Sequence, residues 1–84
     1  MGIIFTKNKL PVFRLTEVRK HNSRNDCWII VKNKVYDVTN FINKHPVGYQ
    51  AILNYAGTDC TMHLSFHSNK ARKILSKYLI GRIC

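Results

Sequence analysis

Two short apolar runs in the first half of the chain, residues 27–31 and 35–38, have the composition of β-strands. Both are rich in β-branched and aromatic residues, which fit an extended, half-buried backbone. The three residues between them, 32–34, are polar and include an asparagine, which suits a tight turn. The pattern therefore predicts a β-hairpin, and residues 12–14 are a candidate for one further short strand.

Short helices are predicted on both sides of this hairpin. Residues 15–18 open a helix before it, with Thr16 as a candidate N-cap. A second helix begins after the hairpin at Thr39, another candidate N-cap. It must end before His45, because Pro46 disfavours helical backbone in the residue that precedes it.

Three more helices are predicted in the second half of the chain. Residues 50–55 have apolar positions at helical spacing, and Gly57 is their candidate C-cap. Residues 61–66 form a shorter helix, and residues 69–78 form a final basic one with Ser68 as its N-cap. The apolar face of this last helix consists of Ala71, Ile74, Leu75 and Tyr78. Several short helices with a few strands make the expected fold class α+β.

A chain of 84 residues has room for one small domain. Pro11 separates an N-terminal tail, residues 1–10, from the domain, residues 11–84. No stretch approaches the roughly 20 apolar residues of a membrane-spanning helix, so we expect a soluble protein. The three cysteines are an odd set without close pairs, which argues against a disulfide framework and for the reducing cytoplasm. We expect a monomer.

The charge is strongly positive: 14 lysines and arginines against four acidic residues give +10. A basic excess fits a nucleic-acid surface, attraction to an anionic membrane, or steering towards an acidic protein. The cations are spread along the chain, without the aromatic platforms or groove-reading helix of nucleic-acid-binding modules. We therefore expect no nucleic-acid partner and keep such a module only as an alternative.

The first six residues fit the pattern for N-myristoylation of Gly2, and Lys7 and Lys9 could add electrostatic attraction to a membrane. An apolar tail or an extra edge strand explains the same residues without modification. Peripheral membrane contact through the N-terminus is thus a secondary expectation.

Two histidines stand at breaks between predicted helices: His45 precedes Pro46, and His67 precedes Ser68. Imidazoles that project from helix ends can grip a metal or a flat cofactor from opposite sides. Neutral imidazole suits iron, zinc and copper. Spacing alone is weak evidence, because a histidine in a small domain is more often a surface or satisfied core residue.

Other chemistry is poorly supported. A zinc site from Cys60, His63 and His67, with Cys27 as a distant fourth ligand, lacks the paired first half of a zinc finger. With only four carboxylates in the chain, no set of nucleophile, base and orienting residue stands out. We therefore expect no hydrolytic activity.

The sequence around His45 resembles the haem-binding signature of the cytochrome b5 family, whose usual form ends in His-Pro-Gly-Gly. The signature covers residues 35–48, and Trp28 stands where the family has its tryptophan. Residues 56–61 resemble the family's Ala-Gly-x-Asp-Ala-Thr turn. Matches to its second histidine and closing strand are His67, Ser68, Ala71, Tyr78, Ile80 and Gly81. The resemblance covers residues 12–83.

This resemblance implies a small mixed sheet with short helices that form two helix-loop-helix walls of a haem pocket. It implies non-covalent haem b with His45 and His67 as axial ligands, and the absence of Cys-x-x-Cys-His agrees. Two histidine ligands leave no open position at the iron, so the implied function is electron transfer. The implied donor is a flavin-dependent cytochrome b5 reductase-like enzyme, and the acceptor is an oxidoreductase such as a desaturase or hydroxylase. A non-redox haem- or sterol-binding relative is the alternative, although such relatives typically lack both histidines.

Further positions are carried over from the family. Those that match apolar haem contacts are Val31, Val38, Phe41, Ile52, Leu64 and Ile74. Ser68 matches a position that can hydrogen-bond a haem propionate. Leu64 stands where the family generally has phenylalanine, and Phe66 is the candidate replacement for that ring.

Three features depart from the family or compete with the assignment. Val47 replaces the first glycine of the usual pair, where a β-branched residue would be strained if φ is positive. His63 lies four residues before His67 and is the rival ligand, but the match from Ser68 to Gly81 favours His67. The basic charge contrasts with the acidic haem edge common in the family, so we expect an acceptor with an acidic docking face.

Overall fold

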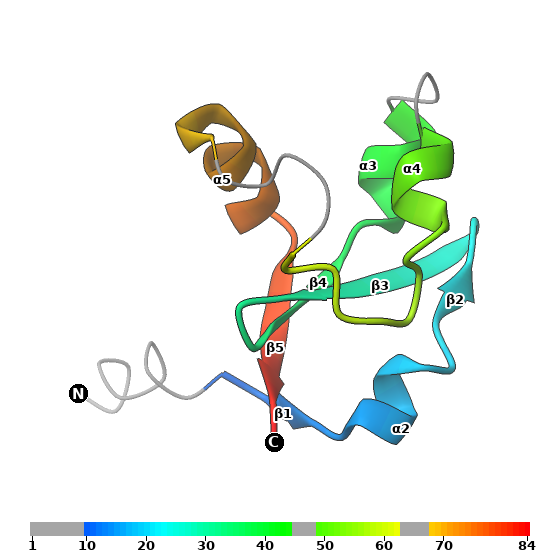
Figure 1. Ribbon diagram of the computed structural model, residues 1–84, viewed down its shortest axis with the longest axis vertical. Coiled ribbons are helices and arrows are strands. Elements are labelled where there is room, and N and C mark those ends of the chain that lie inside the picture. The colour runs from blue at the N-terminus through cyan, green and yellow to red at the C-terminus, as the bar shows by residue number, and fades with distance from the viewer. Residues whose placement is uncertain (1–9, 45–48, 63–67) are drawn as a thin grey trace.

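A computed structural model describes residues 10–44, 49–62 and 68–84 (Figure 1). The tail expected at residues 1–10 lies outside these residues, except for Leu10. Described elements along the chain are β1 (Val12–Phe13), α2 (Leu15–Val18), β2 (Asn22–Ser23), β3 (Asp26–Val31), β4 (Lys34–Asp37), α3 (Thr39–Lys44), α4 (Tyr49–Leu53), α5 (Asn69–Ser76) and β5 (Leu79–Ile83). The mixture of short helices and a small sheet confirms the α+β prediction.

Five strands form one mixed sheet in the order β1-β5-β4-β3-β2. The first strand, β1, runs parallel to β5, and the other neighbours are antiparallel. The last strand therefore lies between the first strand and the hairpin, so it ties the two ends of the domain together. Strand β2, which pairs Asn22 with Cys27, was not predicted from the sequence.

The predicted hairpin is confirmed. Val31 and Lys34 pair across the end of β3 and β4, so the connection is only Lys32 and Asn33. Both connecting residues have positive φ, 50° and 67°, as in the two-residue turns that match the twist of antiparallel strands. Asparagine tolerates this left-handed backbone well, whereas lysine adopts it at a cost.

The N-cap predictions had mixed outcomes. Ser68 caps α5, because its Oγ accepts a hydrogen bond from the Ala71 N–H at 3.1 Å. Thr16 is not a cap: α2 begins at Leu15, and its N-cap is Arg14, two residues before Thr16, in extended backbone. Thr39 opens α3, but its Oγ1 accepts from the Cys27 N–H and donates to Asp37, so it ties α3 to the sheet.

Gly57 has the left-handed backbone predicted for it, but it is not the C-cap of α4, which ends at Leu53. Gly57 follows the turn after α4 with a φ of +76°, and its N–H donates to the Trp28 carbonyl at 2.6 Å. An added Cβ would lie 3.1 Å from the Asn22 Cβ, so both the backbone conformation and the space favour glycine.

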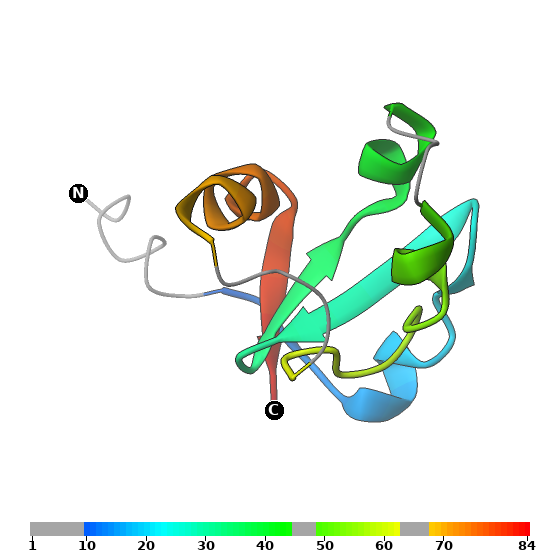
Figure 2. The ribbon, with the colours of Figure 1, turned by 45° about the horizontal axis from the view of Figure 1, so that its top comes forward.

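Alternation along β3 divides the apolar core into two clusters. Cys27, Ile29 and Val31 face the helices α3, α4 and α5. Ile30 faces the other side of the sheet, where it packs with Val18 of α2. Figures 1 and 2 show α5 on one side and α3 with α4 on the other, both above the same face of the sheet. The helices thus make two separate walls over a common floor.

No helix in the described ranges is long and apolar enough to cross a membrane.

Candidate functional site

An apolar cavity of about 100 Å³ lies between the two helical walls. Val38 and Phe41 line it at the start of α3, and Ile52 lines it from α4. The opposite wall is formed by Ala71, Ile74, Leu75 and Tyr78. Apart from the Tyr78 hydroxyl, the described lining consists of hydrocarbon side chains.

Backbone hydrogen bonds hold the two walls at a fixed separation at their base. The Asp37 N–H donates to the Tyr78 carbonyl at 3.0 Å, which joins the end of β4 to the start of β5. The Val38 N–H donates to the Cys27 carbonyl at 2.9 Å. Above these bonds the rings of Phe41 and Tyr78 meet edge to face, with centroids 5.8 Å apart. The cavity is therefore built on the sheet rather than on loops.

Helix α5 presents its apolar face to this cavity because its apolar residues recur at helical spacing. The cationic residues of the same helix, Lys70, Arg72, Lys73 and Lys77, are exposed. The apolar face predicted from residues 71, 74, 75 and 78 is therefore the face that lines the cavity.

The floor below the cavity contains two free, fully buried cysteines, Cys27 and Cys60. Burial raises the pKa of the Cys27 thiol to about 11 and that of the Cys60 thiol to about 12. Both thiols are therefore neutral at physiological pH and pack as small apolar groups. No cluster of histidine, cysteine and acidic side chains suited to a metal occurs among the described residues.

The predicted site residues that the structure describes do not all line one cavity. Val38, Phe41, Ile52 and Ile74 line the cavity together. Val31 belongs to the same core cluster but lines a neighbouring cavity on the other side of Leu75. His45, Leu64, Phe66 and His67 lie outside the described residues, as do Val47 and His63.

Ser68 is exposed and caps α5. Its oxygen accepts from the Ala71 N–H, which leaves its own O–H free to donate to another group. The helix cap and a contact with a carboxylate are therefore compatible roles for this residue.

Three cavity residues were absent from the predicted set: Ala71, Leu75 and Tyr78. The signal that identifies them is the spacing of the apolar face of α5, which the sequence displays. Ile74 alone was carried into the predicted site, although the other three share its face.

His21 lies away from this cavity. Its ring stacks on Trp28 at 3.6 Å and makes hydrogen bonds to Glu17 Oε2 at 2.9 Å and Asp26 Oδ1 at 2.7 Å. Burial disfavours the charged imidazole, but the two carboxylates outweigh it and raise the pKa of His21. The same hydrogen bond from His21 lowers the pKa of Glu17. This cluster joins α2 to β3 and is structural.

The apolar lining of the cavity suits a largely apolar group held between the two walls. The positions of the two candidate ligands in the sequence agree with this geometry. His45 is the residue after the end of α3, and His67 immediately precedes the N-cap of α5. One candidate ligand thus adjoins each wall along the chain.

Comparisons with known proteins agree with this arrangement. A family model described as cytochrome b5-like heme/steroid binding domain matches residues 14–84. Nitrate reductase [NADH] 2 of Arabidopsis thaliana is 45% identical over 80 residues, 94% of this chain and 9% of its own length. Nitrate reductase [NADPH] of Phytophthora infestans is 49% identical over 76 residues, 89% of this chain and 8% of its own. The chain thus spans less than a tenth of these relatives.

Solved structures show the same fold. Cytochrome b558 of Ectothiorhodospira vacuolata, described as a prokaryotic homologue of cytochrome b5, superposes with a TM-score of 0.73 at 35% identity, covering 87% of this chain and 98% of that one. Cytochrome b5 of Ostreococcus tauri virus 2 gives a TM-score of 0.70 at 39% identity, covering 83% and 81%.

Proposed function

Because this chain belongs to the family of cytochrome b5-like haem/steroid-binding domains, we propose that it carries single electrons through a haem iron bound by His45 and His67. Domains of this family bind b-type haem without a covalent link. The observation that carries the proposal is the apolar cavity between two walls, each adjoined in sequence by one of these histidines.

The described residues would bind and shield the haem. Val38, Phe41, Ile52 and Ile74 offer an apolar surface that excludes water from the macrocycle. Haem supplies the one-electron chemistry, and low polarity around it is one of the levers that set its potential. Two axial histidines leave no position for substrate or oxygen, which favours electron transfer over catalysis. The proposed histidines also favour this redox role over the sterol-binding alternative.

Ser68, at the N-cap of α5, would contact a carboxylate of the haem rather than the macrocycle. The free O–H of Ser68 can donate to a haem propionate while its oxygen continues to cap the helix. Replacing Ser68 with alanine would remove both interactions, whereas aspartate would keep the cap and repel the propionate.

The proposed partners follow from charge and from the relatives. The donor is a flavin-dependent reductase and the acceptor an oxidoreductase, such as a desaturase, a hydroxylase or an enzyme of the nitrate reductase type. With a net charge of +10, the chain should dock on acidic faces, and its association should weaken as salt is added. We place this carrier in the cytoplasm.

An absorption spectrum of the purified chain tests the haem ligands. We expect the sharp low-spin bands of haem with two histidine ligands on reduction. His67→Ala and His45→Ala should each give high-spin haem or lose haem, while the matched control His63→Ala should leave the spectrum unchanged. A colourless protein that takes up no haemin contradicts the proposal. Loss of the low-spin bands only in the His63 variant would reassign the second ligand.

A further inference from the structure

Within the described residues, none of the cations beside the hairpin and α5 forms an ion pair with an acidic side chain. The chain contains only four carboxylic side chains, and all of them belong to described residues. Their side-chain partners are His21 and Lys20 for Glu17, His21 for Asp26, Thr39 for Asp37, and Thr61 for Asp59. None of these contacts reaches the cations around the hairpin.

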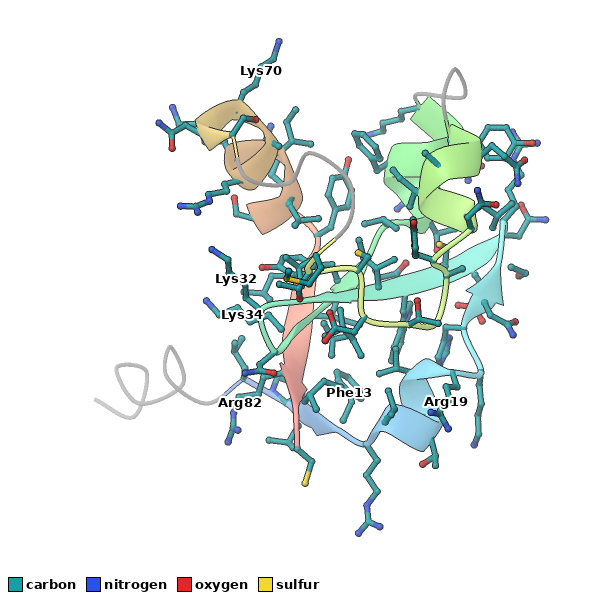
Figure 3. All side chains as sticks on the ribbon, in the orientation of Figure 1. Phe13, Arg19, Lys32, Lys34, Lys70 and Arg82 are labelled. Carbon is teal, nitrogen blue, oxygen red and sulfur yellow. The ribbon has the colours of Figure 1, made fainter. Side chains whose placement is uncertain are left out.

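Three of these cations surround a second cavity, of about 240 Å³. It lies between the β3–β4 hairpin and α5, and Lys32, Lys34 and Arg72 line it together with Tyr36. Figure 3 shows Lys32 and Lys34 projecting from the hairpin on the same side of the molecule, with Arg82 below them. Val31 and Leu75 complete the described lining with apolar surface. The cavity has room for a group larger than a single water molecule.

The placement of two of these cations is unfavourable for the fold. Lys32 occupies a turn position with a φ of 50°, where glycine or asparagine is preferred. Thr61 holds it there, because the Lys32 N–H donates to the Thr61 Oγ1 at 2.8 Å. Lys34 lies directly opposite Arg82 in the β4–β5 ladder, and like charges at such a pair are destabilising. Folding alone therefore does not explain these residues.

The chemistry of the lining indicates the kind of ligand. Arginine offers a planar fork of donors that matches phosphate geometry, and lysine offers a compact charge. Burial raises the pKa of the Tyr36 phenol, which keeps its O–H as a neutral donor. Three cations in one cavity match an anion that carries more than one charge better than a single carboxylate.

We propose that the cavity lined by Lys32, Lys34, Tyr36 and Arg72 binds a multivalent oxyanion of the phosphate class. The ligand is either a soluble phosphate or the phosphate of a lipid headgroup, since both present the same oxygens. The site is separate from the haem cavity, with Leu75 lining both, and its existence does not depend on the haem ligands.

The test is a titration of the full haem-loaded chain with inorganic pyrophosphate, followed by amide chemical shifts and calorimetry. We expect saturable binding, with shifts concentrated in residues 31–36 and 72–75. The double variant Lys34→Gln/Arg72→Gln should weaken binding at least tenfold. The matched control Lys73→Gln/Lys77→Gln removes the same charge from positions that do not line the cavity, and it should change affinity by less than twofold.

Two arms separate the sources of the phosphate. Sedimentation with phosphatidylcholine vesicles containing phosphatidic acid tests the headgroup, and pyrophosphate tests the soluble ligand. Binding in either arm that the double variant loses and the control keeps supports the site and identifies its source. Equal losses in both variants would show general attraction to a basic surface and would overturn the proposal, as would no binding in either arm.

Discussion

Replacing Gly81 with alanine should destabilise the pairing between β5 and β1. Gly81 lies in β5, and a Cβ there would lie 2.5 Å from the Pro11 carbonyl oxygen and 2.5 Å from Phe13 Cε2. The phenylalanine ring can rotate, but the carbonyl belongs to the backbone of the segment that leads into β1. The added methyl group can therefore be accommodated only if β1 moves away from β5.

The cost follows from the bonds that this movement breaks. The Arg82 N–H donates to the Pro11 carbonyl at 2.9 Å, and the Cys84 N–H donates to the Phe13 carbonyl at 3.0 Å. At about 1 kcal/mol for each hydrogen bond, their loss costs about 2 kcal/mol. If β1 stays in place, overpacking costs about 1–3 kcal/mol instead. Either route is a large part of the roughly 5 kcal/mol expected for a small domain.

Urea denaturation at constant haem loading measures this change in the free energy of unfolding. We expect a loss of about 2–3 kcal/mol for Gly81→Ala, which corresponds to a drop in Tm of roughly 8–24 °C for a domain of this size. Arg82→Ala is the matched control on the exposed side of the same strand, and it should change stability by less than about 0.5 kcal/mol. A loss below about 0.5 kcal/mol for Gly81→Ala would refute the close approach of β1 to β5.

Two further predictions concern titratable groups outside the haem cavity. At pH 8 a thiol reagent should label the exposed Cys84 rapidly and leave Cys27 and Cys60 unlabelled until the chain unfolds. The reason is that burial and the raised pKa values of Cys27 and Cys60 suppress their thiolates. Mass spectrometry that counts three labels on the folded chain would contradict this burial. The imidazole of His21 should titrate above its usual pKa of 6.5 in an NMR experiment, and its charged form should stabilise the fold fully below pH 6.5 and lose this effect as pH rises through the raised pKa. His21→Gln should then cost roughly 0.5 kcal/mol more at pH 5.5 than at pH 8.5, and an equal cost at both pH values would show that only the stacking on Trp28 matters.

Local patterns in the sequence predicted the features that depend on neighbouring residues. The hairpin follows from two β-rich runs with a polar turn, and the Ser68 cap follows from a serine before a periodic apolar face. Gly57 in left-handed backbone follows from its place after a helix. Each of these features is decided within about ten residues, where side-chain preferences act directly on the backbone.

Contacts between residues far apart in the chain could not be predicted from local sequence patterns. The parallel pairing of β1 with β5 joins residues about 70 positions apart, and a two-residue strand has no periodicity to display. Thr39 was predicted to cap a helix because nothing local reveals that the Cys27 N–H lies within reach of its hydroxyl. Val31 stands in an apolar run that ends at the turn, so its composition could not indicate which of two adjoining cavities it lines.

The basic charge and the apolar cavity can coexist because the apolar and the cationic residues of α5 lie on different faces of the helix. Residues 71, 74 and 75 line the apolar cavity proposed to hold the haem, while Arg72, one position away from Ala71, lines the cationic cavity instead. Charges on the outer face can therefore change without altering the apolar lining. The cations nevertheless remain close enough to act on a charge that forms in the haem cavity, because Leu75 is common to both linings. An oxyanion bound beside Arg72 would offset the cations and favour the more positive, oxidised iron, and the oxidised protein would by reciprocity bind that anion more tightly.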